Sequence, residues 1–156
     1  ITEERKYIVK VTGEIPSSID SHIMQTYLVS DPDSEVRLRQ REWANGNVVN
    51  VHTTTKTLKA NQQVETERQV SNALYESLLS QADPYRQTIC KQRKSFIWKG
   101  QYFELDTYEK QLEGLVILET KGITDKEHVN FPPFIEEVED ITGNQKYYNY
   151  NLALRH

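Results

Sequence analysis

The stretch that decides the fold covers residues 35–58 and reads EVRLRQREWANGNVVNVHTTTKTL. In its first half an arginine stands at every second position from 37 to 41, and Val36 and Leu38 take alternate positions. Because side chains two apart point the same way in a β-strand, this spacing places the arginines on one face. Asn45-Gly46 then supplies two residues that tolerate positive φ, as a tight hairpin turn requires. The stretch therefore predicts two antiparallel strands, one of which carries a row of arginines.

The same period of two recurs through most of the chain, and the short links between these stretches favour antiparallel pairing. Two helices are expected, over residues 71–82 after a Ser71 cap and over residues 132–142 between a first-turn proline and Gly143. The aromatic tail, residues 147–154, is expected to pack down. The predicted fold class is mainly β (α+β) with a few flanking helices, and its eight strands cover residues 3–12, 22–30, 35–43, 48–58, 64–70, 88–97, 101–108 and 115–121.

Charged residues share a strand face in nearly every predicted strand. An ordinary antiparallel sheet also turns a polar face to water, so solvated ion pairs are one interpretation. In the other, the strands close into an eight-stranded antiparallel barrel with this face inward. Such a lumen suits a polyanion, because basic groups bind phosphate oxygens and carboxylates hold a divalent ion. The face comprises Lys6, Arg37, Arg39, Arg41, Lys56, Lys91, Arg93 and Lys121, and the acidic Glu4, Glu65, Glu67, Glu104, Asp106 and Glu119.

Length and composition narrow the class of protein. The 156 residues are expected to form one domain, 1–156, and the absence of Met at Ile1 indicates a piece of a longer chain. A net charge of −4 argues against bulk nucleic-acid binding. The single cysteine, Cys90, excludes an internal disulfide and indicates a reducing compartment. No stretch is apolar enough to span a membrane and no signal peptide is visible, so we expect a cytoplasmic protein.

Eight short motifs follow one another along the chain, and in this order they resemble those of the CYTH domains, the triphosphate tunnel metalloenzymes. The second half of the chain looks most like the CYTH modules at the C-terminus of P-loop NTPase fusion proteins, although no Walker-type sequence occurs here. The motifs are carried by Glu4 and Lys6; Gln25, Tyr27 and Leu28; Arg37 and Arg39; Thr54 and Lys56; Glu65 and Glu67; Lys91 and Arg93; Glu104 and Asp106; and Glu119 after Gly114-Leu115.

The resemblance implies a charged β-tunnel that binds a triphosphate-like polyanion, such as a nucleotide or tripolyphosphate, together with Mg²⁺ or Mn²⁺. The family chemistry is hydrolysis of the terminal phosphate, so an active protein would be a metal-dependent triphosphatase. Family positions assign phosphate binding to Lys6, Arg37, Arg39, Lys56, Lys91 and Arg93, metal binding to Glu4, Glu65, Glu67, Asp106 and Glu119, and water positioning to Glu65, Glu67 or Glu104.

Three positions depart from the family pattern. Thr2 and Lys121 stand where carboxylates are common, and Gln63 replaces an arginine. These departures favour an alternative, a non-catalytic module that senses a phosphate ligand or phosphoinositide and regulates an attached P-loop NTPase. A weaker alternative is a structural domain whose charges only pair with one another. We therefore expect this chain to bind triphosphate better than it hydrolyses it.

Overall fold

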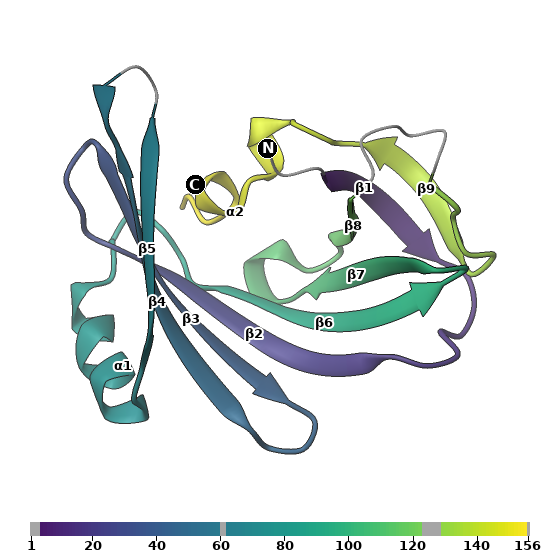
Figure 1. Ribbon diagram of the computed structural model, residues 1–156, viewed down its shortest axis with the longest axis horizontal. Helices are drawn as coiled ribbons and strands as arrows, with labels where there is room; N and C mark the ends of the chain where they lie inside the picture. Colours follow the sequence, from purple (N-terminus) through teal and green to yellow (C-terminus); the bar gives the residue numbers. More distant parts are fainter. Residues whose placement is uncertain (1–3, 60–61, 123–128, 156) are drawn as a thin grey trace.

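The computed structural model describes residues 4–59, 62–122 and 129–155. In this part of the chain nine strands form one antiparallel sheet, in the order β5-β4-β3-β2-β6-β7-β8-β1-β9 (Figure 1). All eight predicted strands are present, with bounds that shift by a few residues. The strands are β1 Glu4–Val11, β2 Ile19–Leu28, β3 Ser34–Trp43, β4 Val48–Thr57, β5 Gln63–Val70, β6 Ile89–Trp98, β7 Gln101–Tyr108, β8 Val116–Lys121 and β9 Ile135–Asp140.

The ninth strand replaces a predicted helix. Residues 132–142 were expected to be helical, with Phe134, Val138 and Ile141 as the buried stripe, but β9 (Ile135–Asp140) is extended and pairs with β1. Phe134 and Ile141 are indeed buried, whereas Val138 is exposed. Pairing with the edge of β1 decides the outcome, since it satisfies backbone hydrogen bonds that a short, acid-rich helix would have to satisfy alone.

The helices are short. The predicted helix at residue 71 is confirmed as α1 (Asn72–Leu78), and the Ser71 side chain accepts a hydrogen bond from the Leu74 N–H as an N-cap. A 3₁₀ turn, Leu79–Gln81, continues it, and two more 3₁₀ turns cover Lys110–Leu112 and Gln145–Tyr147. The C-terminal α2 (Asn149–Leu152) packs down as expected, because Ala153 just beyond it is buried. No helix in the described ranges is long and apolar enough to cross a membrane.

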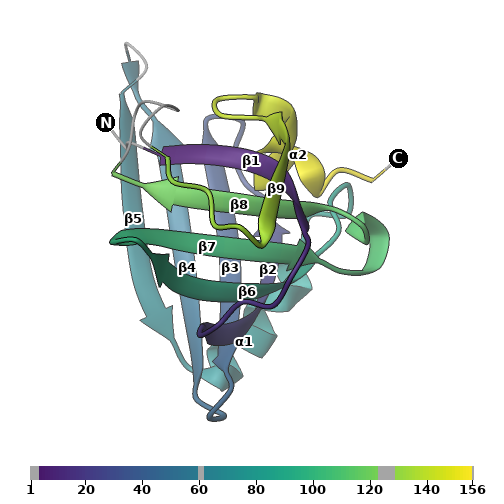
Figure 2. The same cartoon turned by 90° about the vertical axis from the view of Figure 1, so that its right-hand side faces the viewer.

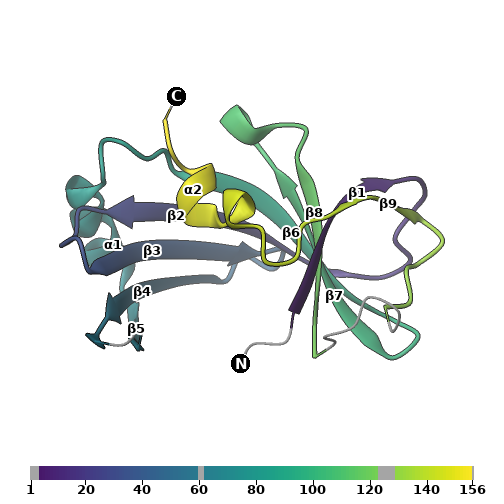
Figure 3. The ribbon, with the colours of Figure 1, turned by 90° about the horizontal axis from the view of Figure 1, so that it is seen from above.

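The sheet is not closed into the predicted barrel. Within the described residues β5 pairs only with β4, and β9 lies along β1 from Tyr7 to Val11. In a closed barrel β5 would pair with the free edge of β1, but part of that edge is already hydrogen-bonded to β9. The sheet instead curves strongly, so that β3–β5 and β7–β1 stand on opposite sides of the C-terminal segment (Figures 1 and 3).

Apolar residues pack on both faces of this curved sheet. On the convex face, Phe103 and Leu118 pack against Phe134, which precedes β9. Figure 2 shows β9 crossing β8 on this face. On the same face, α1 covers β2 and β3 by placing Tyr75 against Leu38. A third cluster lies on the concave face, where Tyr27, Ile89, Tyr108 and Ile117 meet Ile141, Tyr150 and Ala153 from the C-terminal part of the chain. The C-terminal segment is thus anchored inside the curve, where it forms a wall of the site described next.

Candidate anion-binding site

The concave face carries the row of basic side chains that the sequence predicted. Residues paired across an antiparallel ladder lie on the same side of the sheet. Arg39 on β3 is paired with Gln25 on β2, and Ile23 on β2 is paired with Lys91 on β6. Register therefore brings two basic pairs from strands far apart in sequence to one face: Arg37 and Arg39 on β3, and Lys91 and Arg93 on β6.

These four basic residues line a cavity of about 310 Å³, here called the inner pocket. Lys6 on β1 joins them, and Tyr148, Asn149 and Tyr150 of the C-terminal segment form the opposite wall. A second cavity of about 640 Å³, the outer pocket, adjoins it and is lined by Glu4, Thr55, Gln63 and Glu65 among others. The two pockets share Lys6, Glu35, Arg37, Tyr148 and Tyr150, so they form one continuous cleft.

Arg39 is the clearest sign of what the inner pocket binds. Its Nε is buried and has no hydrogen-bond partner in the described part of the chain. Burial lowers the pKa of the Arg39 guanidinium, and the neighbouring positive charge of Arg93 lowers that pKa further. A buried donor on a charged group is costly when unpaired. The side chain therefore lacks an acceptor that an anionic ligand in the pocket would provide.

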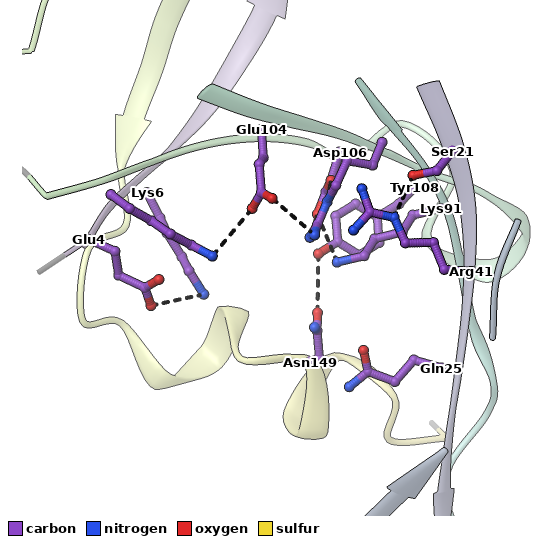
Figure 4. Close-up of polar contacts among 12 residues, drawn as sticks. Glu4, Lys6, Ser21, Gln25, Arg41, Lys91, Glu104, Asp106, Tyr108 and Asn149 are labelled. Atoms are coloured by element: carbon purple, nitrogen blue, oxygen red, sulfur yellow. Dashed lines mark hydrogen bonds and ion pairs between the residues drawn. The ribbon is translucent and has the colours of Figure 1, made fainter. Parts of the chain in front are cut away.

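Lys91 and Arg93 are held in place by carboxylates instead. Lys91 Nζ lies 2.7 Å from Asp106 Oδ2, and Arg93 binds Asp106 in bidentate fashion, with Nε–Oδ1 and Nη2–Oδ2 distances of 2.8 and 3.0 Å. Arg93 Nη1 also lies 3.3 Å from Glu104 Oε2. Burial would raise the pKa of Asp106, but Lys91 and Arg93 together lower it to about 2. Both oxygens of this predicted metal ligand are thus engaged by cations (Figure 4).

Two other predicted metal ligands meet directly. Lys6 on β1 is paired with Glu119 on β8, and the Glu119 carboxyl is hydrogen-bonded to that of Glu4. Burial and the hydrogen bond to Glu4 raise the pKa of Glu119 to about 7, while the same hydrogen bond lowers the pKa of Glu4. Two carboxyls that share a proton are also two oxygen donors that a divalent cation can bridge once the proton leaves. This carboxyl pair fits Mg²⁺ or Mn²⁺, which commonly use one or two carboxylates together with water and phosphate oxygens.

Of the remaining predicted carboxylates, Glu104 lies beside the carboxyl pair, because it is paired with Glu119 across β7 and β8. Glu65 and Glu67 are on the edge strand β5, where Glu65 Oε1 lies 3.7 Å from Arg37 Nη2 and Glu67 accepts a 3.5 Å hydrogen bond from Thr53. Glu104 accepts from the Tyr102 hydroxyl and lies 3.8 Å from Lys121 Nζ. No group of three or more acidic, histidine or cysteine side chains in the described ranges is arranged to hold a metal ion. The carboxyl pair is therefore the candidate that the fold assembles.

Two predictions on β4 fall on the wrong side of the sheet for this site. Lys56 is paired with Ser34 on β3 and with Val64 on β5, which places it on the convex face together with Thr54. Thr53 and Thr55 face the cleft instead, because they are paired with Arg37 and Glu35. The structure therefore does not bring Lys56 to the phosphate-binding set.

Of the three departures from the family pattern, two are visible in the structure. Gln63 lines the outer pocket, and Lys121 is paired across strands with Glu4. Thr2 lies outside the described residues. The tail residues Tyr148, Asn149 and Tyr150 were predicted to pack down, and their role as a pocket wall was missed. The hydrogen bond from the Tyr108 hydroxyl to Asn149, 3.2 Å long, helps to fix that placement (Figure 4), as does the edge-on contact of Tyr150 with Tyr27.

Comparison with known proteins shows the fold. No protein-family model matches the sequence, and no curated protein matches it significantly. Two solved structures of NE1496 superpose on nearly the whole chain. One, described as a hypothetical protein, is 25% identical with a TM-score of 0.71 and 99% coverage of both chains. The other, described as an inorganic triphosphatase, is 26% identical with a TM-score of 0.70 and covers 100% of this chain and 96% of that one.

The chain thus has a β-rich fold of the CYTH or triphosphate tunnel type. The resemblance inferred from the motifs is confirmed at this level. The finer prediction, a module fused to a P-loop NTPase, has no support in these comparisons. The described sheet is open, so the fold type is shared without the closed barrel that was expected.

Proposed function

We propose that this protein binds a triphosphate-like polyanion in the cleft, together with a divalent metal ion, and hydrolyses its terminal phosphate. Arg39 supports this most strongly, because its buried Nε has no hydrogen-bond partner among the described residues and four further basic residues line the same pocket. The similarity to NE1496, a structure described as an inorganic triphosphatase, supports hydrolysis as the reaction class.

Phosphoryl transfer needs mainly positioning and charge neutralisation. Arg37 and Arg39 would donate hydrogen bonds to phosphate oxygens from β3, in the planar geometry that suits phosphate. Lys91 and Arg93 would do so from β6, oriented by Asp106. Glu4 and Glu119 would hold Mg²⁺ or Mn²⁺, which supplies charge neutralisation and an activated water when bound.

The second candidate is binding without turnover, as in a sensing module. Lys121 favours it, because its ammonium lies 3.8 Å from Glu104 and its strand position faces Glu4. A positive charge there lowers the affinity of the carboxyl pair for a metal while it still attracts phosphate. Regulation of an attached P-loop NTPase remains a prediction.

The test combines binding and turnover. Tripolyphosphate with Mg²⁺ or Mn²⁺ should raise the melting temperature of the wild type, since a ligand of the native state stabilises it. Arg39→Ala should weaken the binding by about 1.5–3 kcal/mol, the range for hydrogen bonds to charged groups. Arg68→Ala is the matched control, because Arg68 is exposed on β5 opposite His52, on the convex face.

Equal binding by wild type and Arg39→Ala would contradict the assigned pocket. Release of phosphate by the wild type, lost in Glu119→Gln with binding retained, would establish hydrolysis at the carboxyl pair. Tight binding with no turnover under either metal would instead support the sensing module.

A further inference from the structure

We propose that an aromatic pocket at the mouth of the cleft holds the planar ring of an organic triphosphate, such as a nucleoside triphosphate, and that Tyr85 is its stacking residue. The inference rests on the proposed function, because it assigns the phosphates of the same ligand to the inner pocket. It selects an organic triphosphate over inorganic tripolyphosphate as the preferred ligand.

The aromatic pocket is a cavity of about 400 Å³ between two loops. One loop, residues 29–34, joins β2 to β3 and contributes Val29 and Pro32; the other, residues 83–85, follows α1 and contributes Tyr85. The pocket shares Pro32, Ser34 and Tyr150 with the outer pocket, and Tyr150 lines the inner pocket too. A continuous path therefore leads from the arginines of β3 to the aromatic pocket.

The walls of the aromatic pocket are preorganised. The Arg86 guanidinium lies 3.4 Å from the centre of the Tyr150 ring, and Arg86 Nε donates a 2.9 Å hydrogen bond to the Tyr150 carbonyl. Tyr27 also packs edge-on against the Tyr150 ring, with the two ring centres 5.1 Å apart. The loop is fixed as well, since the Tyr85 N–H donates to Asp83 Oδ1 and the Asp83 N–H to the Tyr27 carbonyl, both at 2.9 Å.

On this fixed backbone the Tyr85 residue is 75% exposed and Val29 is 63% exposed. Neither side chain is part of the apolar clusters that hold the fold together. A large ring on a fixed backbone and open to solvent offers stacking area, and only its side-chain torsions must be ordered when a ligand binds. Stacking of a base on an aromatic ring is worth a substantial share of nucleotide affinity.

The charges separate the two ends of such a ligand. The inner pocket is basic, whereas the aromatic pocket is bordered by Asp31 and by Asp83, whose carboxylate pairs with Arg86 at 3.2 Å and accepts the Tyr85 N–H. The Asp31 carboxylate would repel phosphate and accept a hydrogen bond from the exocyclic amine of a base. Phosphates are therefore directed inward and the ring outward, and a volume of about 400 Å³ lies within the usual range for small-molecule sites.

The experiment compares two ligands on matched variants. Binding of the β,γ-methylene analogue of ATP and of inorganic tripolyphosphate, both with Mg²⁺, is measured by calorimetry. Tyr85→Ala and Val29→Ala are tested against Val138→Ala, a valine of similar exposure (61%) on β9. Tyr85→Ala should weaken the nucleotide analogue about tenfold, or about 1.4 kcal/mol, and Tyr85→Phe should restore binding.

Tripolyphosphate affinity should not change in any of these variants. An equal loss of both ligands in Tyr85→Ala, or no loss of either, would overturn the aromatic subsite. Wild-type binding of tripolyphosphate without the nucleotide analogue would overturn the subsite and leave the proposed function intact. Binding of neither ligand would overturn the proposed function itself.

Discussion

The basic wall and the carboxyl pair face the same cleft but are built differently. The basic wall is formed by Arg37, Arg39, Lys91 and Arg93. Asp106 fixes two of these cations, and the buried Nε of Arg39 has no partner in the ranges that the structure describes. In the carboxyl pair, Glu4 and Glu119 are hydrogen-bonded to each other next to Lys121, and burial together with this hydrogen bond raises the pKa of Glu119 to about 7. The basic wall is therefore preorganised for an anion, whereas a metal ion at the carboxyl pair competes with protonation of Glu119. This difference suggests that anion binding tolerates change at the carboxyl pair better than turnover does.

The largest expected effect concerns what holds the basic wall in place. Asp106→Asn removes the charge that compensates two buried cations, Lys91 and Arg93. Breaking a buried ion pair in this way costs about 3–5 kcal/mol of unfolding free energy. Denaturant unfolding measures the loss, with Asp20→Asn as the control, because Asp20 pairs with Lys94 near the surface at 2.8 Å and should cost at most about 1 kcal/mol. A similar cost in both variants would show that Asp106 has no special role.

The same carboxylate predicts how stability depends on pH. The pKa of Asp106 in the folded protein is about 2, below the ordinary value of 3.8. A lowered pKa means that Asp106 stabilises the fold fully above about pH 4 and loses this contribution as the pH falls through about 2. The gap in unfolding free energy between wild type and Asp106→Asn should therefore be wide at pH 7 and narrow between pH 4 and pH 2. A gap that is constant with pH would contradict this assignment.

A smaller effect is expected at the carboxyl pair. Lys121→Glu replaces a cation with a carboxylate that faces Glu4 across the strands. Because affinity for hard cations grows with the number of carboxylates, Mn²⁺ should bind about tenfold more tightly. Calorimetric titration with Mn²⁺ tests this, and Lys59→Glu, an exposed residue just beyond β4, is the control for a general change in charge. Unchanged Mn²⁺ affinity would place the metal elsewhere.

The smallest expected effect is that of a substitution at Lys56, which should leave the affinity for tripolyphosphate almost unchanged. Lys56→Ala should leave tripolyphosphate affinity within about twofold of the wild type, since Lys56 lies on the convex face. Arg37→Ala, on the neighbouring strand and the concave face, should weaken binding clearly. If Lys56→Ala weakened binding as strongly as Arg37→Ala, the register between β3 and β4 in solution would differ from the one described here.

The register between β3 and β4 could have been predicted from the sequence of the turn that joins them. The hairpin at Asn45-Gly46 closes with Trp43 opposite Asn47, and counting back from that turn pairs Arg37 with Thr53. The motif Thr54-x-Lys56 had placed Lys56 on the same face as the arginines of the preceding strand. Alternation within one strand does not show which of its two faces is continuous with a given face of the neighbouring strand. The turn supplies that information, and it was the stronger signal.

The sequence by itself determined the eight strands, the capped helix α1 and the shared face of Arg37 and Arg39 on β3. These features depend on a period of two and on turn or cap residues, which are local properties of the chain. These features therefore do not depend on how distant parts of the chain pack. The charged face by itself left two interpretations open, solvated ion pairs and a lumen for a polyanion, and the resemblance to the CYTH domains favoured the second.

Only the tertiary structure decided how distant segments meet. Glu4 and Glu119 come together because β1 pairs with β8, more than a hundred residues later in the chain. The other edge of β1, opposite β8, turns residues 135–140 into β9 and leaves the described sheet open. The packing of Ala153 inside the curve makes Tyr150 a wall of the cleft. The periodicity of the sequence within one strand does not predict these pairings. The free energy that selects them comes from contacts between strands rather than within them.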